Sequence, residues 1–177
     1  LTYWLRRYAL HKSLLDIPNG RSSHTVPTPR GGGAAIVAGY LIALVWMFGC
    51  GALALSAFPA VFVAGFSIAA LGFLDPHGHI SARRRLLGHF LASAWGLFWL
   101  GGLPSINVFG ATLEPGVIGN VLAAFYLVWL LNLYNFMDGI DGIASVEAIT
   151  VCAGAVLIYA LEGFTSLIWP AVLLTGA

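Results

Sequence analysis

The amino-acid sequence predicts an all-α fold, a polytopic integral membrane bundle with about five to six transmembrane helices. Hydrophobic residues make up 59% of the 177 residues and charged residues only 8%, whereas an ordinary soluble domain carries about 25% charged residues. The mean hydropathy of +0.90 fits a chain surrounded mostly by lipid, where helices satisfy their own backbone hydrogen bonds. The composition excludes a soluble fold. We therefore expect the chain to lie in a lipid bilayer and to bind no nucleic acid.

Apolar runs close to the length of about 20 residues that crosses a bilayer follow one another along the chain. They cover residues 34–57, 58–74, 86–101, 117–134 and 143–161, and a sixth begins at Phe164. Pro59 cannot continue a helix without loss of a hydrogen bond, so we expect a tight hairpin at 56–59. The third run is short for a complete span.

Residues 1–177 are expected to form a single membrane domain, because no internal repeat or linker divides the chain. Residues 1–33 precede the first run as a loop rich in Pro, Gly and Arg. We expect truncation at both ends, because the chain starts at Leu1 and its last apolar stretch stops at Ala177 without a polar tail.

All eight Lys and Arg residues fall in two segments that two apolar runs separate. They are Arg6, Arg7, Lys12, Arg21 and Arg30 in the first segment, and Arg83, Arg84 and Arg85 in the second. Two spans return the chain to the same side, and the excess of positive charge predicts that this side is cytoplasmic. Two further spans bring residues 135–142 back to it, so the loops at 75–85 and 135–142 are both predicted to be cytoplasmic.

The first candidate site is the basic segment that ends in three consecutive glycines at 31–33. Prolines fix backbone angles there and the glycines permit close approach, so we expect a stiff, shaped loop entering a helix. Arg21, His24 and Arg30 could donate hydrogen bonds to a phosphate. The alternative, more common for such segments, is that the basic residues only set the topology and touch anionic headgroups.

The second candidate is Asp75, which ends the second apolar run close to Arg83, Arg84 and Arg85. A carboxylate near membrane depth usually marks a site for an ion, a proton or a substrate. An ordinary surface pair with arginine explains it equally well. His77 and His79 are more simply polar loop residues than metal ligands.

The third candidate follows the fourth apolar run, where Asn132 and Asn135 precede Asp138 and Asp141. If a helix continues through this stretch, the spacing of three places Asn135, Asp138 and Asp141 on one face. Carboxylate and amide oxygens suit Mg²⁺, which binds through few protein oxygens together with substrate phosphates and water. The alternative is a capped turn, because Asp-Gly pairs commonly end helices.

Taken together, the strings PN-R-SSH-PTPRGGG, GF-D-HGHI-R and N-NFMDGIDG resemble the polyprenyl-phosphate N-acetylhexosamine-1-phosphate transferases, glycosyltransferase family 4. Their order along the chain and their shared predicted side strengthen the resemblance. The first string is more similar to the branch that starts O-antigen, enterobacterial common antigen or capsule chains than to the peptidoglycan branch.

The resemblance implies a Mg²⁺-dependent enzyme, with Mn²⁺ as an alternative ion, on the cytoplasmic face of the bacterial inner membrane. It would transfer an N-acetylhexosamine 1-phosphate from a UDP-N-acetylhexosamine to undecaprenyl or another polyprenyl phosphate and release UMP. The resemblance also implies that this transfer is the first membrane step of cell-envelope polysaccharide synthesis. Assembly into a homodimer is left open.

By the same resemblance, Asp75 matches an aspartate proposed to act as a base on the lipid phosphate. Asn135 matches an asparagine near the metal, and Asp138 and Asp141 match aspartates that contact metal or nucleotide, so Asn135 and Asp138 are the metal candidates. The residues expected to bind substrate are Asn19, Arg21, His24, Arg30 and Asn132.

Two departures from the family pattern are visible. Pro76 stands where the family usually has a second aspartate, and a proline pushes the residue before it out of helix geometry. The chain also stops before the family's GD-x-G-S aspartate and its histidine-rich loop, so this fragment alone is expected to be inactive. The competing hypotheses are a non-catalytic relic or assembly subunit, and a lipid-phosphate-binding or transport protein.

Overall fold

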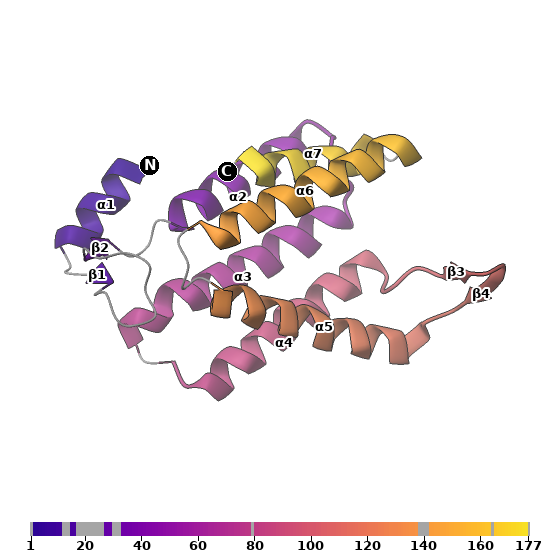
Figure 1. The fold of residues 1–177 in the computed structure, drawn as a ribbon, viewed down its shortest axis with the longest axis horizontal. Coiled ribbons are helices and arrows are strands. Elements are labelled where there is room, and N and C mark those ends of the chain that lie inside the picture. Colours follow the sequence, from indigo (N-terminus) through magenta and orange to yellow (C-terminus); the bar gives the residue numbers. More distant parts are fainter. Residues whose placement is uncertain are drawn as a thin grey trace. The chain divides into compact units, whose positions relative to one another are not determined.

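The computed structural model describes residues 2–11, 15–16, 27–29, 33–78, 80–137, 142–163 and 165–176 (Figure 1). The chain folds as two compact units. The first unit joins Leu1–Ala52 with Tyr134–Ala177, and the second is Leu53–Leu133.

Helices make up most of the described chain. They are α1 (Thr2–His11), α2 (Gly33–Gly49), α3 (Ala57–Gly78), α4 (Ala82–Leu100), α5 (Gly116–Met137), α6 (Ile143–Glu162) and α7 (Thr165–Gly176). Two short antiparallel ribbons accompany them, β1 (Leu15–Asp16) with β2 (Thr28–Pro29), and β3 (Ile106–Val108) with β4 (Ala111–Leu113). The predicted all-α membrane class is confirmed.

The apolar runs of the sequence correspond in order to α2 through α7. Within the described ranges, three helices are long and apolar enough to cross a membrane: Ala57–Leu74 of α3, Gly116–Phe136 of α5, and α6. The shorter α2 is also apolar. The chain is therefore a multi-pass membrane protein.

The first unit holds α1, α2, α6 and α7. Helix α6 packs against α7, α7 packs against α2, and α1 contacts both α2 and β2 (Figure 1). The β1–β2 ribbon pairs Leu15 with Pro29 and Asp16 with Thr28. The prediction of a loop over residues 1–33 is wrong for Thr2–His11, which form α1, since a run without a spanning length of apolar residues can still form a short helix.

In the second unit, α3 and α4 form a closely packed antiparallel pair. A Cβ at Gly88 would overlap the side chain of Leu71, and one at Gly96 would lie 3.8 Å from the carbonyl oxygen of Ala60. The indole Nε1–H of Trp95 donates to the carbonyl of Pro59 at 2.8 Å. Small residues let helix backbones approach in lipid, where no hydrophobic effect draws helices together.

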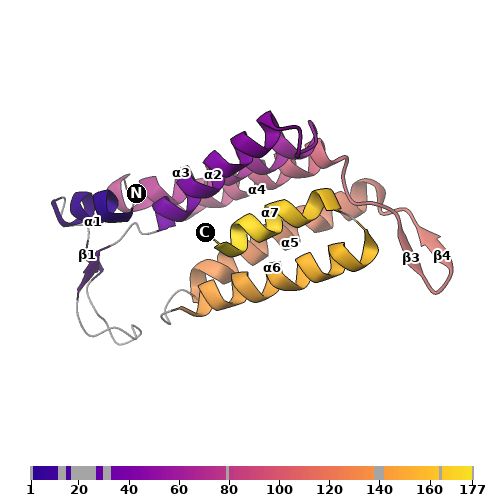
Figure 2. The same cartoon turned by 90° about the horizontal axis from the view of Figure 1, so that it is seen from above.

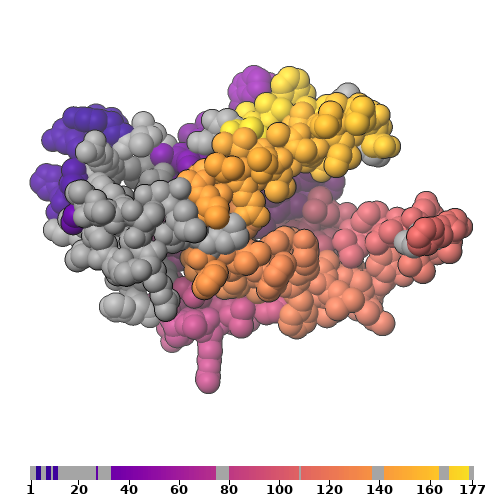
Figure 3. All heavy atoms as spheres, in the orientation of Figure 1, coloured from indigo at the N-terminus to yellow at the C-terminus, as the bar shows by residue number. Residues whose placement is uncertain are grey.

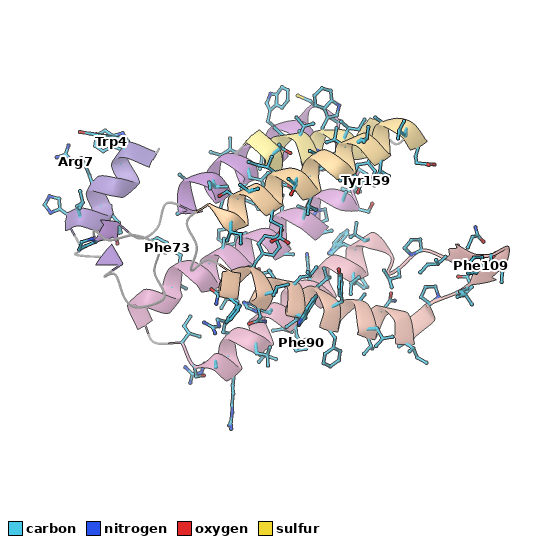
Figure 4. All side chains as sticks on the ribbon, viewed as in Figure 1. Trp4, Arg7, Phe73, Phe90, Phe109 and Tyr159 are labelled. Carbon is cyan, nitrogen blue, oxygen red and sulfur yellow. The ribbon has the colours of Figure 1, made fainter. Side chains whose placement is uncertain are left out.

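The other contacts of the second unit involve α5 and the β3–β4 hairpin. Phe90 of α4 and Phe125 of α5 meet edge to face with ring centroids 5.0 Å apart. Phe109 and Gly110 turn the hairpin with φ values of 49° and 86°, as in the type I′ turn that matches strand twist. The hairpin projects beyond α4 and α5, with Phe109 fully exposed near its tip (Figures 2, 3 and 4).

The hairpin predicted at 56–59 is wrong. Helix α2 already ends at Gly49, where Gly51 adopts a φ of 72° and the amides of Gly51 and Ala52 bond to the carbonyls of Phe48 and Met47. This glycine cap closes the helix. Pro59 instead lies in the first turn of α3, where a missing N–H costs nothing because that amide has no helical partner.

The helices also extend further than the sequence predicted. Helix α3 continues through Asp75 and Pro76 to Gly78, α4 starts at Ala82, and α5 runs to Met137. The expectation that Pro76 forces Asp75 out of helix geometry is therefore wrong. A proline removes one backbone hydrogen bond, which a helix can forgo near its end.

Gly102 offers a test of how the chain leaves α4. Its φ is +83°, and a Cβ there would lie 2.6 Å from Nδ2 and from Oδ1 of Asn120. That Oδ1 accepts a hydrogen bond from the backbone N–H of Leu103 at 2.8 Å. We expect Gly102→Ala to lower the free energy of unfolding by about 3 kcal/mol, combining left-handed strain with loss of this bond, measured by thermal unfolding in detergent.

Gly101→Ala is the matched control. Gly101 has a similar φ of +80°, but a Cβ there meets nothing within 4 Å. The control is expected to lose only the strain, about 1 kcal/mol. Equal losses in the two variants would contradict a role for Asn120 in holding this turn.

Candidate active site

The α3–α4 turn carries the first part of the candidate site. Asp75 lies in the last turn of α3, and its side chain is outside the described part of the chain. The contact between Leu71 and Gly88 fixes the register of the two antiparallel helices. Because Asp75 is one turn beyond Leu71 and Arg84 is one turn before Gly88, Asp75 lies level with Arg84.

The start of α4 is well suited to an anion. Arg83 and Arg84 are exposed and Arg85 is partly buried. Ser81, at the N-cap position, makes no side-chain capping bond. The first amides of a helix and its dipole both favour negative charge, and arginine adds strong donors. This end of α4 could therefore hold a phosphate or pair with Asp75.

The α5–α6 connection carries the second part. Asn135 is exposed in the last turn of α5. Asn132, one turn earlier, donates its Nδ2–H to the carbonyl of Val128 at 2.7 Å, which leaves its Oδ1 as an acceptor. Helix α6 then starts after Gly142, whose φ is 81°. Asp138 and Asp141 lie outside the described residues.

The prediction of one helical face for Asn135, Asp138 and Asp141 required a helix that continues through Asp141. The described part of α5 reaches Met137, and the described chain resumes at Gly142, before α6. Asp138 and Asp141 lie outside the described residues, so the shared face stays a prediction.

Most predicted substrate-binding residues cannot be placed. Asn19, Arg21, His24 and Arg30 lie outside the described residues. Within the described ranges, no three His, Cys, Asp or Glu side chains come together as a metal site. Of the two predicted metal ligands, Asn135 lies among the described residues and Asp138 does not.

Two polar residues stand out that the sequence analysis did not select. Glu147 lies in the second turn of α6, and His89 lies on α4 with only 9% of its surface exposed. Glu147 Oε2 and His89 Nδ1 are both buried without a hydrogen-bond partner in the described part of the chain. The signal was present in the sequence, because each is an isolated ionisable residue inside an apolar run.

Comparison with known proteins identifies the family. The family model of glycosyl transferase family 4 matches residues 58–177, more than half of the chain. The chain therefore belongs to glycosyl transferase family 4. The matched region includes Asp75 and the stretch from Asn132 to Asp141, whereas the basic segment before residue 33 precedes it.

Several curated relatives are similar to this chain. The decaprenyl-phosphate N-acetylglucosaminephosphotransferase of Mycolicibacterium smegmatis is 29% identical over 193 residues, covering 99% of this chain and 48% of the relative. The protein of the same name from Mycobacterium leprae is 31% identical over 154 residues, covering 76% and 37%. The undecaprenyl-phosphate alpha-N-acetylglucosaminyl 1-phosphate transferase of Thermotoga maritima is 27% identical over 148 residues, covering 82% and 43%.

The chain spans about half, or less, of the length of these relatives. No solved structure matches it. The suspected family is thus confirmed from sequence relatives, while the activity of the whole protein belongs to the proposal that follows.

Proposed function

We propose that the protein containing this chain transfers an N-acetylhexosamine 1-phosphate from a UDP-sugar to a polyprenyl phosphate and releases UMP. The observation that carries the proposal is the match of the family model to residues 58–177, which contain the Asp75 and 135–141 motifs. The names of the relatives, which specify decaprenyl or undecaprenyl phosphate and N-acetylglucosamine, support this reaction class.

In the proposed reaction, an oxygen of the lipid phosphate attacks the phosphorus that bears the sugar. A new P–O–P bond forms, the bond between the two phosphates of the UDP-sugar breaks, and UMP leaves. Asp75 accepts the proton of the lipid phosphate. At the start of α4, the arginines offer positive charge and the first helix amides offer hydrogen-bond donors to an anionic substrate.

A divalent cation, Mg²⁺ or Mn²⁺, would be held by Asn135 and Asp138, and Asp141 would contact the metal or the nucleotide. The amide oxygen of Asn135, exposed at the end of α5, is a hard ligand that suits Mg²⁺. When bound, such a cation neutralises charge that develops on a diphosphate.

The proposal places this chemistry on the cytoplasmic face of the bacterial inner membrane, because every Lys and Arg lies on one predicted side. In a variant with Cys50 and Cys152 changed to serine, we expect a cysteine at exposed Ser81 to react with a membrane-impermeant maleimide only after permeabilisation. Phe109 is exposed on the β3–β4 hairpin, which follows the C-terminal end of α4. The cysteine of a Phe109→Cys variant is expected to react in intact cells. The reverse pattern of labelling would refute the orientation.

The central test uses the full-length parent protein in membranes with UDP-GlcNAc and undecaprenyl phosphate. We expect labelled sugar phosphate to enter the lipid fraction, and we expect Asp75→Asn to lower kcat by about 100-fold or more through loss of the base. Glu114→Gln, which neutralises an exposed carboxylate in the same unit, is the control and should retain activity. Full activity in Asp75→Asn would exclude its role as base.

Removal of the cation provides a separate test. We expect a chelator to abolish transfer, and Mg²⁺ or Mn²⁺ to restore it, because the charge that develops on the phosphate of the departing UMP needs neutralisation. The half-saturating Mg²⁺ concentration should rise in Asn135→Ala by about tenfold, which corresponds to the loss of one ligand worth about 1.4 kcal/mol. Transfer that persists in the chelator would rule out the metal.

Pro76 favours a second candidate, a non-catalytic relic that binds the lipid phosphate. Assays in the same membranes distinguish the relic from the transferase. Binding of polyprenyl phosphate without any turnover, whichever UDP-N-acetyl sugar is supplied, would support the relic and contradict the transferase.

A further inference from the structure

Helices α4 and α5 of the second unit run in opposite directions and leave a groove between them (Figure 1). At one level the rings of Phe90 and Phe125 meet edge to face, with centroids 5.0 Å apart. Nearer the C-terminal end of α4, the backbone N–H of Leu103 donates to Oδ1 of Asn120. The groove lies between these two contacts and has a volume of about 500 Å³, a size typical of small-molecule sites.

Small residues open this groove. Gly101 lines it, and a Cβ there would meet nothing within 4 Å. Gly88 and Gly96 of the same helix let α3 approach, so the small residues of α4 serve close packing on one side and leave room on the other. Among the described residues that line the groove, Asn120 is the one polar side chain and none is charged. The small lining residues are Ala94, Gly101 and Gly102 on α4 and Ala124 on α5.

The groove faces the hydrocarbon of the bilayer. Residues Gly116–Phe136 of α5 are long and apolar enough to cross a membrane. Asn120 is four residues from the start of this span, about 6 Å at 1.5 Å per residue. Phe98 and Val117, which line the groove, are each 79% exposed, as lipid-facing side chains are. Unfilled space forfeits dispersion contacts, so a hydrocarbon chain suits the groove.

Asn120 adds a hydrogen-bond donor at the end of the groove near the bilayer surface. Its Oδ1 accepts from the N–H of Leu103 at 2.8 Å, which fixes the orientation of the amide. Its Nδ2 has no hydrogen-bond partner in the part of the chain that the structure describes. A polar group beside hydrocarbon is costly without a partner, so the ligand of the groove should carry an acceptor at this level.

We propose that the groove between α4 and α5 binds one acyl chain of a phospholipid, whose ester carbonyl accepts a hydrogen bond from Nδ2 of Asn120. The lipid belongs to the leaflet opposite to Arg83–Arg85, which lie at the other end of α4. The ester decides the lipid class, because acyl esters lie where the hydrocarbon core meets the headgroups. A prenyl chain is hydrocarbon throughout and would leave Nδ2 without an acceptor. The proposal does not depend on the transferase function.

The bound chain contributes to the pairing of the two helices. In lipid no hydrophobic effect draws helices together, so their association depends on packing contacts and hydrogen bonds. A chain in the groove supplies packing contacts to α4 and α5 between the Phe90–Phe125 pair and Asn120. Because a ligand that binds the folded state stabilises it, phospholipid should raise the melting temperature of the delipidated protein.

The experiment uses the full-length parent protein, stripped of lipid in detergent, and two phosphatidylcholine probes with chains of equal length. One probe has ester linkages, and the other has ether linkages and therefore no carbonyl. We expect native mass spectrometry to show one lipid bound per chain. The ester probe should bind about fivefold more tightly, as expected for one neutral hydrogen bond, and should raise the melting temperature more.

Two variants separate the contributions of the donor and of the groove. Asn120→Asp keeps an oxygen that accepts from Leu103 but loses the NH₂ donor, so the two probes should bind it equally. Ala94→Leu places a larger side chain in the groove from an exposed position and should weaken both probes by about tenfold. Ala153→Leu, at an exposed position of α6, is the matched control and should bind both probes like the wild type.

Four results would overturn the proposal. Equal binding of the two probes to the wild type would remove the ester contact, and unchanged binding in Ala94→Leu would place the lipid elsewhere. A wild-type protein that binds neither probe would show that another part of the parent protein fills the groove. Displacement of the ester probe by an equimolar amount of undecaprenyl phosphate would show that the groove holds a prenyl chain instead.

Discussion

The helices depend on one constraint, that a polar group inside the bilayer must find its partner within the protein. Several hydroxyl and amide side chains meet it inside their own helix by donating to the carbonyl four residues earlier. The donors are Ser67, Asn132, Thr150 and Thr175. These four side chains therefore need no neighbouring helix, whereas the indole of Trp95 on α4 donates to the carbonyl of Pro59 on α3.

The fold class and the order of the helices could be predicted because apolar length is a direct consequence of bilayer thickness. The helix ends could not. The sequence predicts a turn at Pro59, but this residue lies in the first turn of α3, where its missing N–H is harmless. The real stop comes earlier at Gly51, whose left-handed φ depends on backbone hydrogen bonds that an apolar sequence does not reveal.

The candidate site was predictable as a set of motifs but not as an arrangement. Family resemblance pointed to Asp75 and to the 135–141 stretch, and the family match includes both. The shared helical face of Asn135, Asp138 and Asp141 stays a prediction, because Asp138 and Asp141 lie outside the described residues. Glu147 belongs to no motif; its isolation in an apolar run is visible in the sequence, and the structure adds that its Oε2 is buried without a hydrogen-bond partner among the described residues.

The distribution of charge along the chain bears on the chemistry of the proposed reaction. Every Lys and Arg lies at or before Arg85, whereas residues 86–177 contain only acidic charges, namely Glu114, Asp138, Asp141, Glu147 and Glu162. Basic groups suit the phosphates of two anionic substrates, and carboxylates suit a divalent cation. In the proposed reaction the two sets would have separate tasks: the arginines would neutralise the incoming lipid phosphate, and the carboxylates would hold the cation that neutralises charge on the departing phosphate.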